Sequence, residues 1–300
     1  MRITPETKLI VLTYQPDKNF RQPPADAQCL LAPAKLNLDL RIIGRRSDGY
    51  HLLESVFTLI SLYDRLWLRV NNNGQIKLHT PIENIDSQQD LTVRAATLLR
   101  QQSCKNLGAD IWLQKNIPMG AGLGGGSSDA ALVLMALNQL WLLNFNQIQL
   151  QQLGLQLGAD VPFFIFGQTA FAQGIGEKLS RIQIPKQWYV IIKPPVHVST
   201  PKIFAHKDLT RNSTPRIMPD FQARQHWRND MQKVVTAEYP EVKNALNVLA
   251  NFGKPMMSGS GSCVFLAFAD EDTAQAVYNQ VSNAHQAYCV ASLTKHPFYK

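Results

Sequence analysis

Residues 118–131 read Pro118-Met119-Gly120-Ala121-Gly122-Leu123-Gly124-Gly125-Gly126-Ser127-Ser128-Asp129-Ala130-Ala131, and a mostly apolar run continues to Leu143. Glycine lacks a Cβ, so its backbone reaches positive φ and can approach a ligand closely. The apolar run predicts a buried helix, with Ser127 or Ser128 as its N-cap and Asp129 in its first turn, where a negative charge suits the helix dipole. A glycine loop that leads into a helix N-terminus offers several N–H donors to one anion, which predicts a phosphate site.

Two established glycine patterns fit this loop poorly. Gly120, Gly122 and Gly125 match the dinucleotide fingerprint G-x-G-x-x-G, which expects an acidic residue about 20 positions later. No Asp or Glu occurs at that distance after Gly125. The Walker A pattern requires Lys and then Ser or Thr after its last glycine, and Gly126 stands there instead. A turn without a ligand is the remaining alternative, but five glycines cost backbone entropy that a plain turn does not require.

A strictly alternating segment lies upstream of the loop. Its apolar positions are Leu36, Leu38, Leu40 and Ile42, and its polar positions are Lys35, Asn37, Asp39 and Arg41. This period of two predicts a strand that is buried on one side. From the pattern alone, the polar face would be ordinary solvated surface.

The segments after this strand predict further turns and strands. Ser47-Asp48-Gly49 is a strong turn signal, followed by Tyr50-His51 and an apolar strand over 56–62. Short strands are predicted over 66–70 and 76–79, joined as a hairpin through Asn71-Asn72-Asn73-Gly74. Helical spacing is predicted over 91–100, and a strand over 111–114 leads into the glycine loop.

Three further stretches carry candidate site residues. A helical segment over 148–157 ends at Gly158-Ala159-Asp160-Val161-Pro162, where a lone aspartate before an apolar run is more often a cap than a catalyst. A short helix is predicted to start with Thr200 as its cap and Pro201 in its first position, and it contains Phe204. A second Gly/Ser stretch, residues 257–262, is in isolation a flexible turn, and residues 207–223 form a polar loop that contains proline.

Together these stretches resemble the superfamily of galactokinase, homoserine kinase, mevalonate kinase and phosphomevalonate kinase, over residues 30–293. The string from Pro33 to Leu38, Asp48-Gly49-Tyr50-His51 and the triple glycine resemble the branch that acts on 4-diphosphocytidyl-2-C-methyl-D-erythritol. The resemblance implies an α+β, two-domain superfamily kinase fold. Residues 29–178 would form an ATP-binding, ribosomal-protein-S5-domain-2-like domain, and residues 179–300 a ferredoxin-like α/β sandwich. Residues 1–28 would be an N-terminal extension, poorly ordered at least in part.

The resemblance also implies a reaction, namely ATP-dependent phosphorylation of the 2-hydroxyl of 4-diphosphocytidyl-2-C-methyl-D-erythritol in non-mevalonate isoprenoid synthesis. Asp160 would be the base, and Lys35 would keep it ionised. The substrate would contact Asn37, Tyr50, His51, Thr200 and Phe204. The ATP phosphates would contact Pro118, Met119, Gly120, Ala121, Gly122, Leu123, Gly124, Gly125, Gly126, Ser127 and Ser128. Mg²⁺ would bridge the phosphates with few direct protein ligands, Ser127 or Ser128 being possible ones. Relatives commonly carry Asn-Leu near the adenine, where this chain has Asp90-Leu91.

Composition agrees with a cytoplasmic small-molecule enzyme. The chain has 300 residues, is 45% hydrophobic and 17% charged, and has a formal net charge of +8 whose Lys and Arg residues are scattered. Four cysteines without a C-x-x-C pair and seven histidines without ligand spacing predict neither disulfides nor zinc. We expect no membrane span, no nucleic-acid partner, and a monomer or weak homodimer. The alternatives are another kinase or a decarboxylase of the superfamily, of mevalonate type, and an RNA-binding module, which the basic charge would suit.

Overall fold

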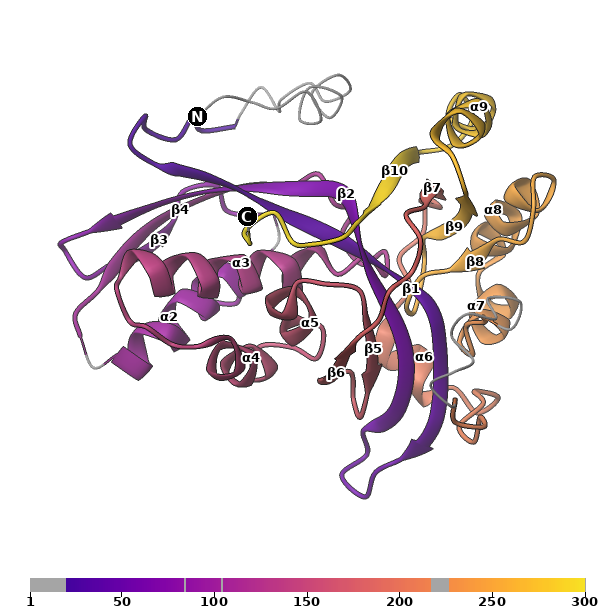
Figure 1. Ribbon diagram of the computed structural model, residues 1–300, viewed down its shortest axis with the longest axis horizontal. Helices are drawn as coiled ribbons and strands as arrows, with labels where there is room; N and C mark the ends of the chain where they lie inside the picture. Colours follow the sequence, from indigo (N-terminus) through magenta and orange to yellow (C-terminus); the bar gives the residue numbers. More distant parts are fainter. Residues whose placement is uncertain (1–19, 84, 104, 217–226, 300) are drawn as a thin grey trace.

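The computed structural model describes residues 20–83, 85–103, 105–216 and 227–299. Most of the expected N-terminal extension and part of the loop over 207–223 therefore lie outside the described residues. The fold is α+β, as expected, and consists of two halves joined by long strands. Figure 1 shows α2–α5 below the sheet of the first half and α6–α9 around the sheet of the second.

Two long antiparallel strands, β1 (Gln28–Arg45) and β2 (His51–Asn71), form the spine of the first half. The predicted turn over 47–49 joins them, and Gly49 adopts a positive φ of 91° there. The expectation that β1 is buried on one side only is wrong, because both faces are covered. Lys35 and Asn37 are only 3% and 2% exposed, and on the opposite face Leu36 packs in an apolar cluster that contains Tyr189 from the second half.

The remaining strands of the first half correct the predicted hairpin. β4 (Gly108–Gln114) pairs antiparallel with β2, and β3 (Ile76–Leu78) pairs parallel with β4. β4 therefore separates the two segments that the turn over 71–74 was expected to pair. Two short strands, β5 (Ala170–Gln173) and β6 (Lys178–Arg181), extend the sheet beside β2.

The helices of the first half pack on this sheet, and those among the described residues are α2 (Leu91–Ser103), α3 (Gly125–Leu140), α4 (Gln147–Leu155) and α5 (Val161–Phe166). The predicted burial of α3 is confirmed, since every residue from Ser128 to Asn138 is buried. A helix that is apolar all round belongs in a core rather than on a surface. The first half is thus built around the helix that the glycine loop begins.

In the described residues, the second half is an antiparallel sheet with helices. Its strands β7 (Trp188–Ile192), β8 (Met256–Met257), β9 (Val264–Phe268) and β10 (Ala287–Leu293) lie in the order β10-β7-β9-β8. α6 (Thr200–Ala205), α7 (Gln232–Glu238) and α8 (Pro240–Ala250) follow β7, and α9 (Glu271–Val281) follows β9. This order of strands and helices is the ferredoxin-like arrangement expected from the sequence.

The two halves share one continuous sheet. β10 pairs with β2 through Ser292 and Leu293, which lie opposite Ile60 and Leu59. The apolar cluster of Leu36 and Tyr189 fills the space between the halves. Within the described residues, no helix has both the length and the apolar character needed to cross a bilayer.

Candidate active site

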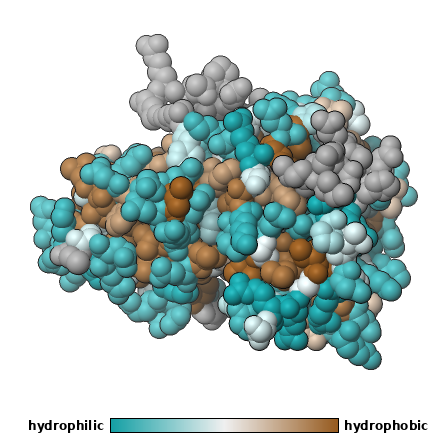
Figure 2. Space-filling model, turned by 60° about the horizontal axis from the view of Figure 1, so that its bottom comes forward, coloured by the Kyte–Doolittle hydropathy of each residue, from teal (hydrophilic) through white to brown (hydrophobic). Residues whose placement is uncertain are grey.

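A cavity of about 720 Å³ is lined by residues from both halves of the molecule. Viewed with its lower side forward, the surface is hollowed between the half with α2–α5 and the half with α6–α9 (Figure 2). All catalytic and substrate residues expected from the sequence line this cavity: Lys35, Asn37, Tyr50, His51, Asp160, Thr200 and Phe204. The fold therefore brings together positions that are up to 169 residues apart, from 35 to 204.

A second cavity, of about 380 Å³, adjoins the first at the glycine loop. Gly120, Gly122, Gly124 and Ser127 line both cavities. The second cavity is further lined by the side of the loop that includes Pro118, Met119, Ala121, Gly125 and Gly126. The loop thus stands between two spaces, one of which holds the candidate base.

The helix that follows the loop begins earlier than the sequence predicted. Gly124 is the N-cap of α3, with a φ of 72° and no side-chain capping bond. The prediction that Ser127 or Ser128 caps the helix is wrong, and so is the placement of Asp129 in the first turn. Ser128 is the first residue whose amide is bonded within the helix, to the Gly124 carbonyl at 2.9 Å. The amides of Gly125, Gly126 and Ser127 have no intrahelical partner, so they can bind an anion.

The two serines at this helix start have different surroundings. The Ser128 hydroxyl is fully buried and donates to the Pro33 carbonyl on β1 at 2.6 Å. With its amide also bonded, Ser128 has no donor left for a phosphate. The Ser127 hydroxyl lines both cavities and has no hydrogen-bond partner among the described residues. Of these two serines, it is therefore Ser127 whose hydroxyl can meet a ligand.

The glycine loop is locked to the second Gly/Ser stretch. The Ser258 hydroxyl donates a hydrogen bond to the Gly122 carbonyl at 2.9 Å and accepts one from the backbone N–H of Asn37 at 3.2 Å. A Cβ on Gly122 would lie 2.1 Å from the Ser258 carbonyl oxygen, so only glycine fits there. Asn229 donates to the carbonyls of Met257 and Gly259, each at 2.7 Å, which fixes the second stretch. The close contact of the two loops positions one end of the phosphate site.

Lys35 and Asp160 face each other across the first cavity. The Lys35 Nζ lies 3.5 Å from Asp160 Oδ2, hydrogen-bonds the Asn37 side chain and sits over the Phe57 ring at 5.1 Å. Asp160 directly precedes α5 and makes no capping bond with its side chain, which is 34% exposed. The capping interpretation of Asp160 therefore has no support in the structure. A partly open carboxylate beside a buried ammonium can accept a proton from a bound hydroxyl group.

A buried ion cluster supports the glycine loop from below. Lys115 donates a hydrogen bond to Asp129 at 2.7 Å and another to Asp64. Asp64 also accepts hydrogen bonds from the backbone amides of Asn116 and Ile117, at 2.6 and 2.8 Å. Burial alone would lower the pKa of Lys115, but Asp129 and Asp64 outweigh burial and raise that pKa. Burial, together with Asp64, raises the pKa of Asp129. The cluster fastens the end of β4 to the first turns of α3.

Aromatic side chains line the end of the first cavity near the tip of the β1–β2 hairpin. The rings of His51 and Phe204 stack with their centroids 4.8 Å apart, whereas Tyr50 is 59% exposed. The prediction that Thr200 caps α6 is wrong, because Ser199 is the N-cap. The Thr200 hydroxyl instead lies 2.6 Å from that of Ser260. This end of the cavity offers flat apolar faces and an imidazole.

Asp90 is one of the acidic residues that line the second cavity. The carboxylate of Asp90 accepts from the amide of Thr92 at 2.8 Å and from its hydroxyl, so Asp90 caps the start of α2. Asp90, Leu91 and Met119 all line this cavity. The substitution of Asp for the expected Asn therefore retains the capping function, and the cavity stays mostly apolar beside the free amides of α3.

Sequence reasoning missed several residues that shape the site. Asn229 and Ser55 act through buried hydrogen bonds, Ser55 accepting from the Asn37 side chain at 2.9 Å. Arg211 reaches the site from the polar loop after α6 and donates to His51 at 3.1 Å. No local pattern marks any of these residues, since each acts on a partner far away in the sequence.

Comparisons with known proteins agree with this geometry. The family model described as "GHMP kinases N terminal domain" matches residues 90–168, and "GHMP kinases C terminal" matches residues 217–287. A protein of Neisseria meningitidis serogroup C (strain 053442), named 4-diphosphocytidyl-2-C-methyl-D-erythritol kinase, is 57% identical over 270 residues, which cover 90% of this chain and 96% of that protein. A protein of the same name from Nitrosospira multiformis is 50% identical, covering 89% and 92%.

Solved structures show the same relationship. A structure titled "Crystal structure of 4-(cytidine 5'-diphospho)-2C-methyl-D-erythritol kinase" is 33% identical with a TM-score of 0.77, covering 88% of this chain and 99% of that one. A mevalonate kinase structure is only 12% identical, with a TM-score of 0.65 over 89% of this chain and 100% of that one. The second likeness shows the fold alone.

Proposed function

This chain belongs to the 4-diphosphocytidyl-2-C-methyl-D-erythritol kinase family of the GHMP kinases, and on that premise we propose how its residues perform the reaction. The enzyme transfers the γ-phosphoryl group of ATP to the 2-hydroxyl of 4-diphosphocytidyl-2-C-methyl-D-erythritol, a step of non-mevalonate isoprenoid synthesis. The observation that carries the proposal is the arrangement of two adjoining cavities, which meet at the glycine loop beside Asp160.

ATP occupies the second cavity in this proposal. Its base lies among the apolar side chains near Leu91 and Met119, and its phosphates reach the glycine loop. The amides of Gly125, Gly126 and Ser127 and the positive end of the α3 dipole bind the phosphate oxygens. Phosphoryl transfer depends mainly on such positioning and on neutralisation of charge.

The acceptor hydroxyl lies in the first cavity between the γ-phosphate and Asp160. Asp160 takes the proton from this hydroxyl as the transfer proceeds, acting as general base. Lys35, held by Asn37 and by its backbone bond to the Leu123 carbonyl at 3.0 Å, supplies a fixed positive charge. That charge lies 3.5 Å from Asp160 Oδ2. It also offsets negative charge that builds up on the transferring group.

The cytidylyl end of the substrate lies at the aromatic end of the first cavity. Tyr50 offers an exposed ring, and Phe204 has one face covered by His51. A base at this end would contact the rings of Tyr50 and Phe204 and lie within reach of the His51 imidazole, which also lines the cavity. Asn37 and Thr200 also line this cavity, where they would contact the rest of the substrate. Binding energy at this remote end then positions the reacting hydroxyl.

Mg²⁺ is proposed as the metal that accompanies ATP. The structure fits such an ion, because the Ser127 hydroxyl is unpartnered among the described residues and lines both cavities. Within the described residues no group of three or more His, Cys, Asp or Glu side chains could hold a metal alone. Magnesium commonly binds through substrate phosphates and one or two protein oxygens. Bound there, the ion would neutralise phosphate charge, with Ser127 as its protein ligand.

We propose two structural units, 29–178 and 179–300, and a cytoplasmic enzyme that acts as a monomer or weak homodimer without a nucleic-acid partner. The described cysteines Cys29, Cys263 and Cys289 are free, which suits a reducing compartment. A cavity of about 720 Å³ suits a small-molecule substrate rather than a polymer.

The proposal is tested by coupled assays of ADP release with a panel of acceptors. We expect ATP turnover with 4-diphosphocytidyl-2-C-methyl-D-erythritol and none with mevalonate, homoserine or galactose. Turnover with mevalonate but not with the cytidylyl substrate would replace this proposal by a mevalonate-type activity. Tight, salt-dependent RNA binding without any ATP turnover would replace it by an RNA-binding function.

A further inference from the structure

Arg211 connects two walls of the aromatic end of the cavity. Its Nε donates to Nε2 of His51 at 3.1 Å, while Nη1 donates to the Leu209 carbonyl at 3.1 Å. Its Nη2 donates to the carbonyls of Phe204 and His206 at 2.9 and 2.8 Å. His51 begins β2 in the first half, whereas Phe204 lies on α6 in the second. One guanidinium group thus fixes an imidazole and the end of a helix relative to each other.

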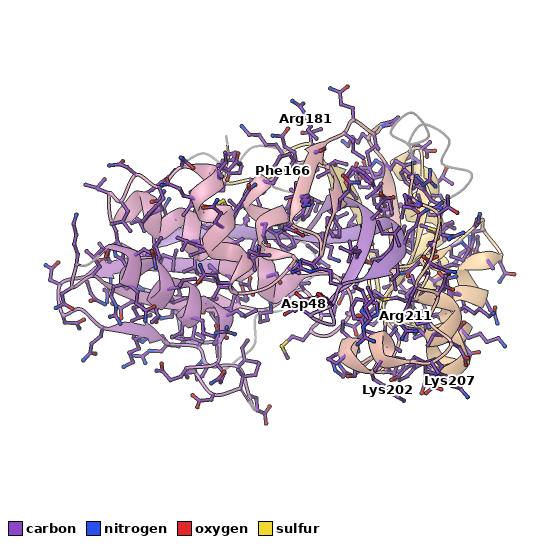
Figure 3. The ribbon with its side chains drawn as sticks, turned by 90° about the horizontal axis from the view of Figure 1, so that it is seen from below. Asp48, Phe166, Arg181, Lys202, Lys207 and Arg211 are labelled. Atoms are coloured by element: carbon purple, nitrogen blue, oxygen red, sulfur yellow. The ribbon has the colours of Figure 1, made fainter. Side chains whose placement is uncertain are left out.

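Figure 3 views the molecule from below, with Arg211 labelled. Arg211 lies between the β1–β2 hairpin, where Asp48 is labelled, and the segment that carries Lys202 and Lys207. No carboxylate among the described residues forms an ion pair with Arg211, and its hydrogen-bond acceptors there are all neutral. Within the described part of the chain no anion therefore cancels its charge, which acts directly on the His51 ring.

The hydrogen bond between Arg211 and His51 determines where the ring carries its proton. A guanidinium group has donors only and keeps its proton at any physiological pH. The Nε2 atom that faces it must therefore present a lone pair, which leaves the hydrogen of the neutral ring on Nδ1. Burial and the charges of Arg211 and Arg45 lower the pKa of His51. The ring is thus neutral at pH 7, with Nδ1–H as its one donor.

Cytosine and uracil differ at the positions that such a donor would meet. Ring atom N3 of cytosine is an acceptor, whereas N3 of uracil carries a hydrogen. An imidazole whose Nδ1–H is fixed as a donor can hydrogen-bond N3 of cytosine. It cannot hydrogen-bond N3 of uracil, because that atom also carries a hydrogen. A site built for one hydrogen bond rejects an analogue that leaves its polar group unpaired.

We propose that Arg211 is a positioning residue that sets base specificity: it holds His51 as the Nδ1–H tautomer and so makes the pocket select cytosine over uracil. The inference rests on the proposed function, because it takes the cytidylyl end of the substrate as the ligand of His51. Arg211 acts through His51 and through the backbone of α6, and it does not touch the reacting atoms.

The tautomer is measured without any substrate. The full chain, labelled with ¹⁵N in histidine, is studied by long-range ¹H–¹⁵N NMR, and His51 is assigned by the signals lost in His51→Gln. We expect Nδ1–H in the unmodified protein, and a shift towards Nε2–H in Arg211→Met. Arg45→Met is the matched control, since Arg45 acts on the ring only through its charge; there we expect Nδ1–H to remain. An Nε2–H ring in the unmodified protein would overturn the proposal, even if the Arg211 variant did not fold.

The consequence for specificity is measured by kinetics. The ratio of kcat/KM for the cytidylyl substrate to that for its uridylyl analogue should fall roughly tenfold in Arg211→Met, the effect of one neutral hydrogen bond. The KM for ATP should stay unchanged. An equal loss for both substrates, with the ratio preserved, would show a merely structural role and refute the proposal. If the unmodified protein turned over neither substrate, the proposed function would fail, while the NMR result would still decide the tautomer.

Discussion

Substitution of Gly124 by alanine should disturb the phosphate loop and the catalytic pair together. A Cβ at this position would lie 2.9 Å from Phe164 Cζ and 3.2 Å from Lys35 Cε. Carbon atoms pack best about 3.5–4.0 Å apart, so the neighbours must move by roughly half an ångström or more. Phe164 is fully buried on α5, the helix that Asp160 precedes. The strain therefore reaches the loop, Lys35 and Asp160 at once.

The expected loss in the free energy of unfolding combines two effects. A non-glycine residue at the φ of 72° costs about 1–2 kcal/mol, and overpacking of a core adds about 1–3 kcal/mol. We expect Gly124→Ala to lose about 2–5 kcal/mol in the free energy of unfolding, with a larger loss for Gly124→Val. A displacement near 1 Å at a catalytic group costs on the order of 10²-fold in rate, so kcat should fall and ATP affinity should weaken.

Urea unfolding, calorimetric titration with ATP and steady-state kinetics measure the three quantities. Gly44→Ala is the matched control, because Gly44 lies on β1, lacks a positive φ and would place its Cβ 3.6 Å from Leu52, an ordinary contact. It should change the free energy of unfolding by less than about 1 kcal/mol. A folded Gly124→Ala variant with unchanged ATP affinity and turnover would show that the phosphate loop lies elsewhere.

Three further predictions address the base, the substrate end and stability. Asp160→Asn should retain ATP binding by calorimetry and lose about 10²–10⁴-fold in kcat; near-normal turnover would remove Asp160 from the mechanism. Tyr50→Ala and Phe204→Ala should each raise the KM for the cytidylyl substrate while sparing that for ATP, because each removes a stacking face worth about 1–3 kcal/mol; a change confined to ATP would reverse the assignment of the cavities. Burial lowers the pKa of His296 from 6.5 to about 3, so below pH 6.5 the unfolded chain binds a proton that the folded protein does not. The free energy of unfolding should therefore fall by about 1.4 kcal/mol per pH unit from about pH 6.5 towards pH 3, with the full contribution present above 6.5. Urea unfolding at several pH values should show a shallower fall for His296→Asn, and equal slopes would contradict the assignment.

Local sequence chemistry predicted much of the architecture of the site. The glycine loop, the turn over 47–49 and the buried helix after Gly124 follow from rules that act over a few residues, and the structure has all three. The alternation in β1 correctly placed Lys35 and Asn37 on one face. Their burial could not be read from that pattern, because it is the rest of the fold that covers them.

The errors share one physical cause, which is a partner far away in the sequence. Ser128 resembles an N-cap, but the Pro33 carbonyl, 95 residues away, takes its hydroxyl. The turn over 71–74 resembles a hairpin turn, which would pair β2 with β3. In the structure β4 lies between these two strands and pairs with both. Arg211 lies in a polar loop without any pattern and gains its importance only when His51 approaches it. Such contacts depend on the tertiary fold, and no local sequence pattern predicts them.

The central claim is that the two cavities join ATP to one hydroxyl of the cytidylyl substrate, and ³¹P NMR of the product tests this most directly. The carbon at position 2 bears a methyl group and no hydrogen, so a phosphate on its oxygen has no carbinol proton to couple with. We predict that ATP and 4-diphosphocytidyl-2-C-methyl-D-erythritol give ADP and one new phosphomonoester resonance without proton splitting, and that Asp160→Asn yields little of it. A resonance split by carbinol protons would place the phosphate on another hydroxyl, and inorganic phosphate alone would contradict the transfer.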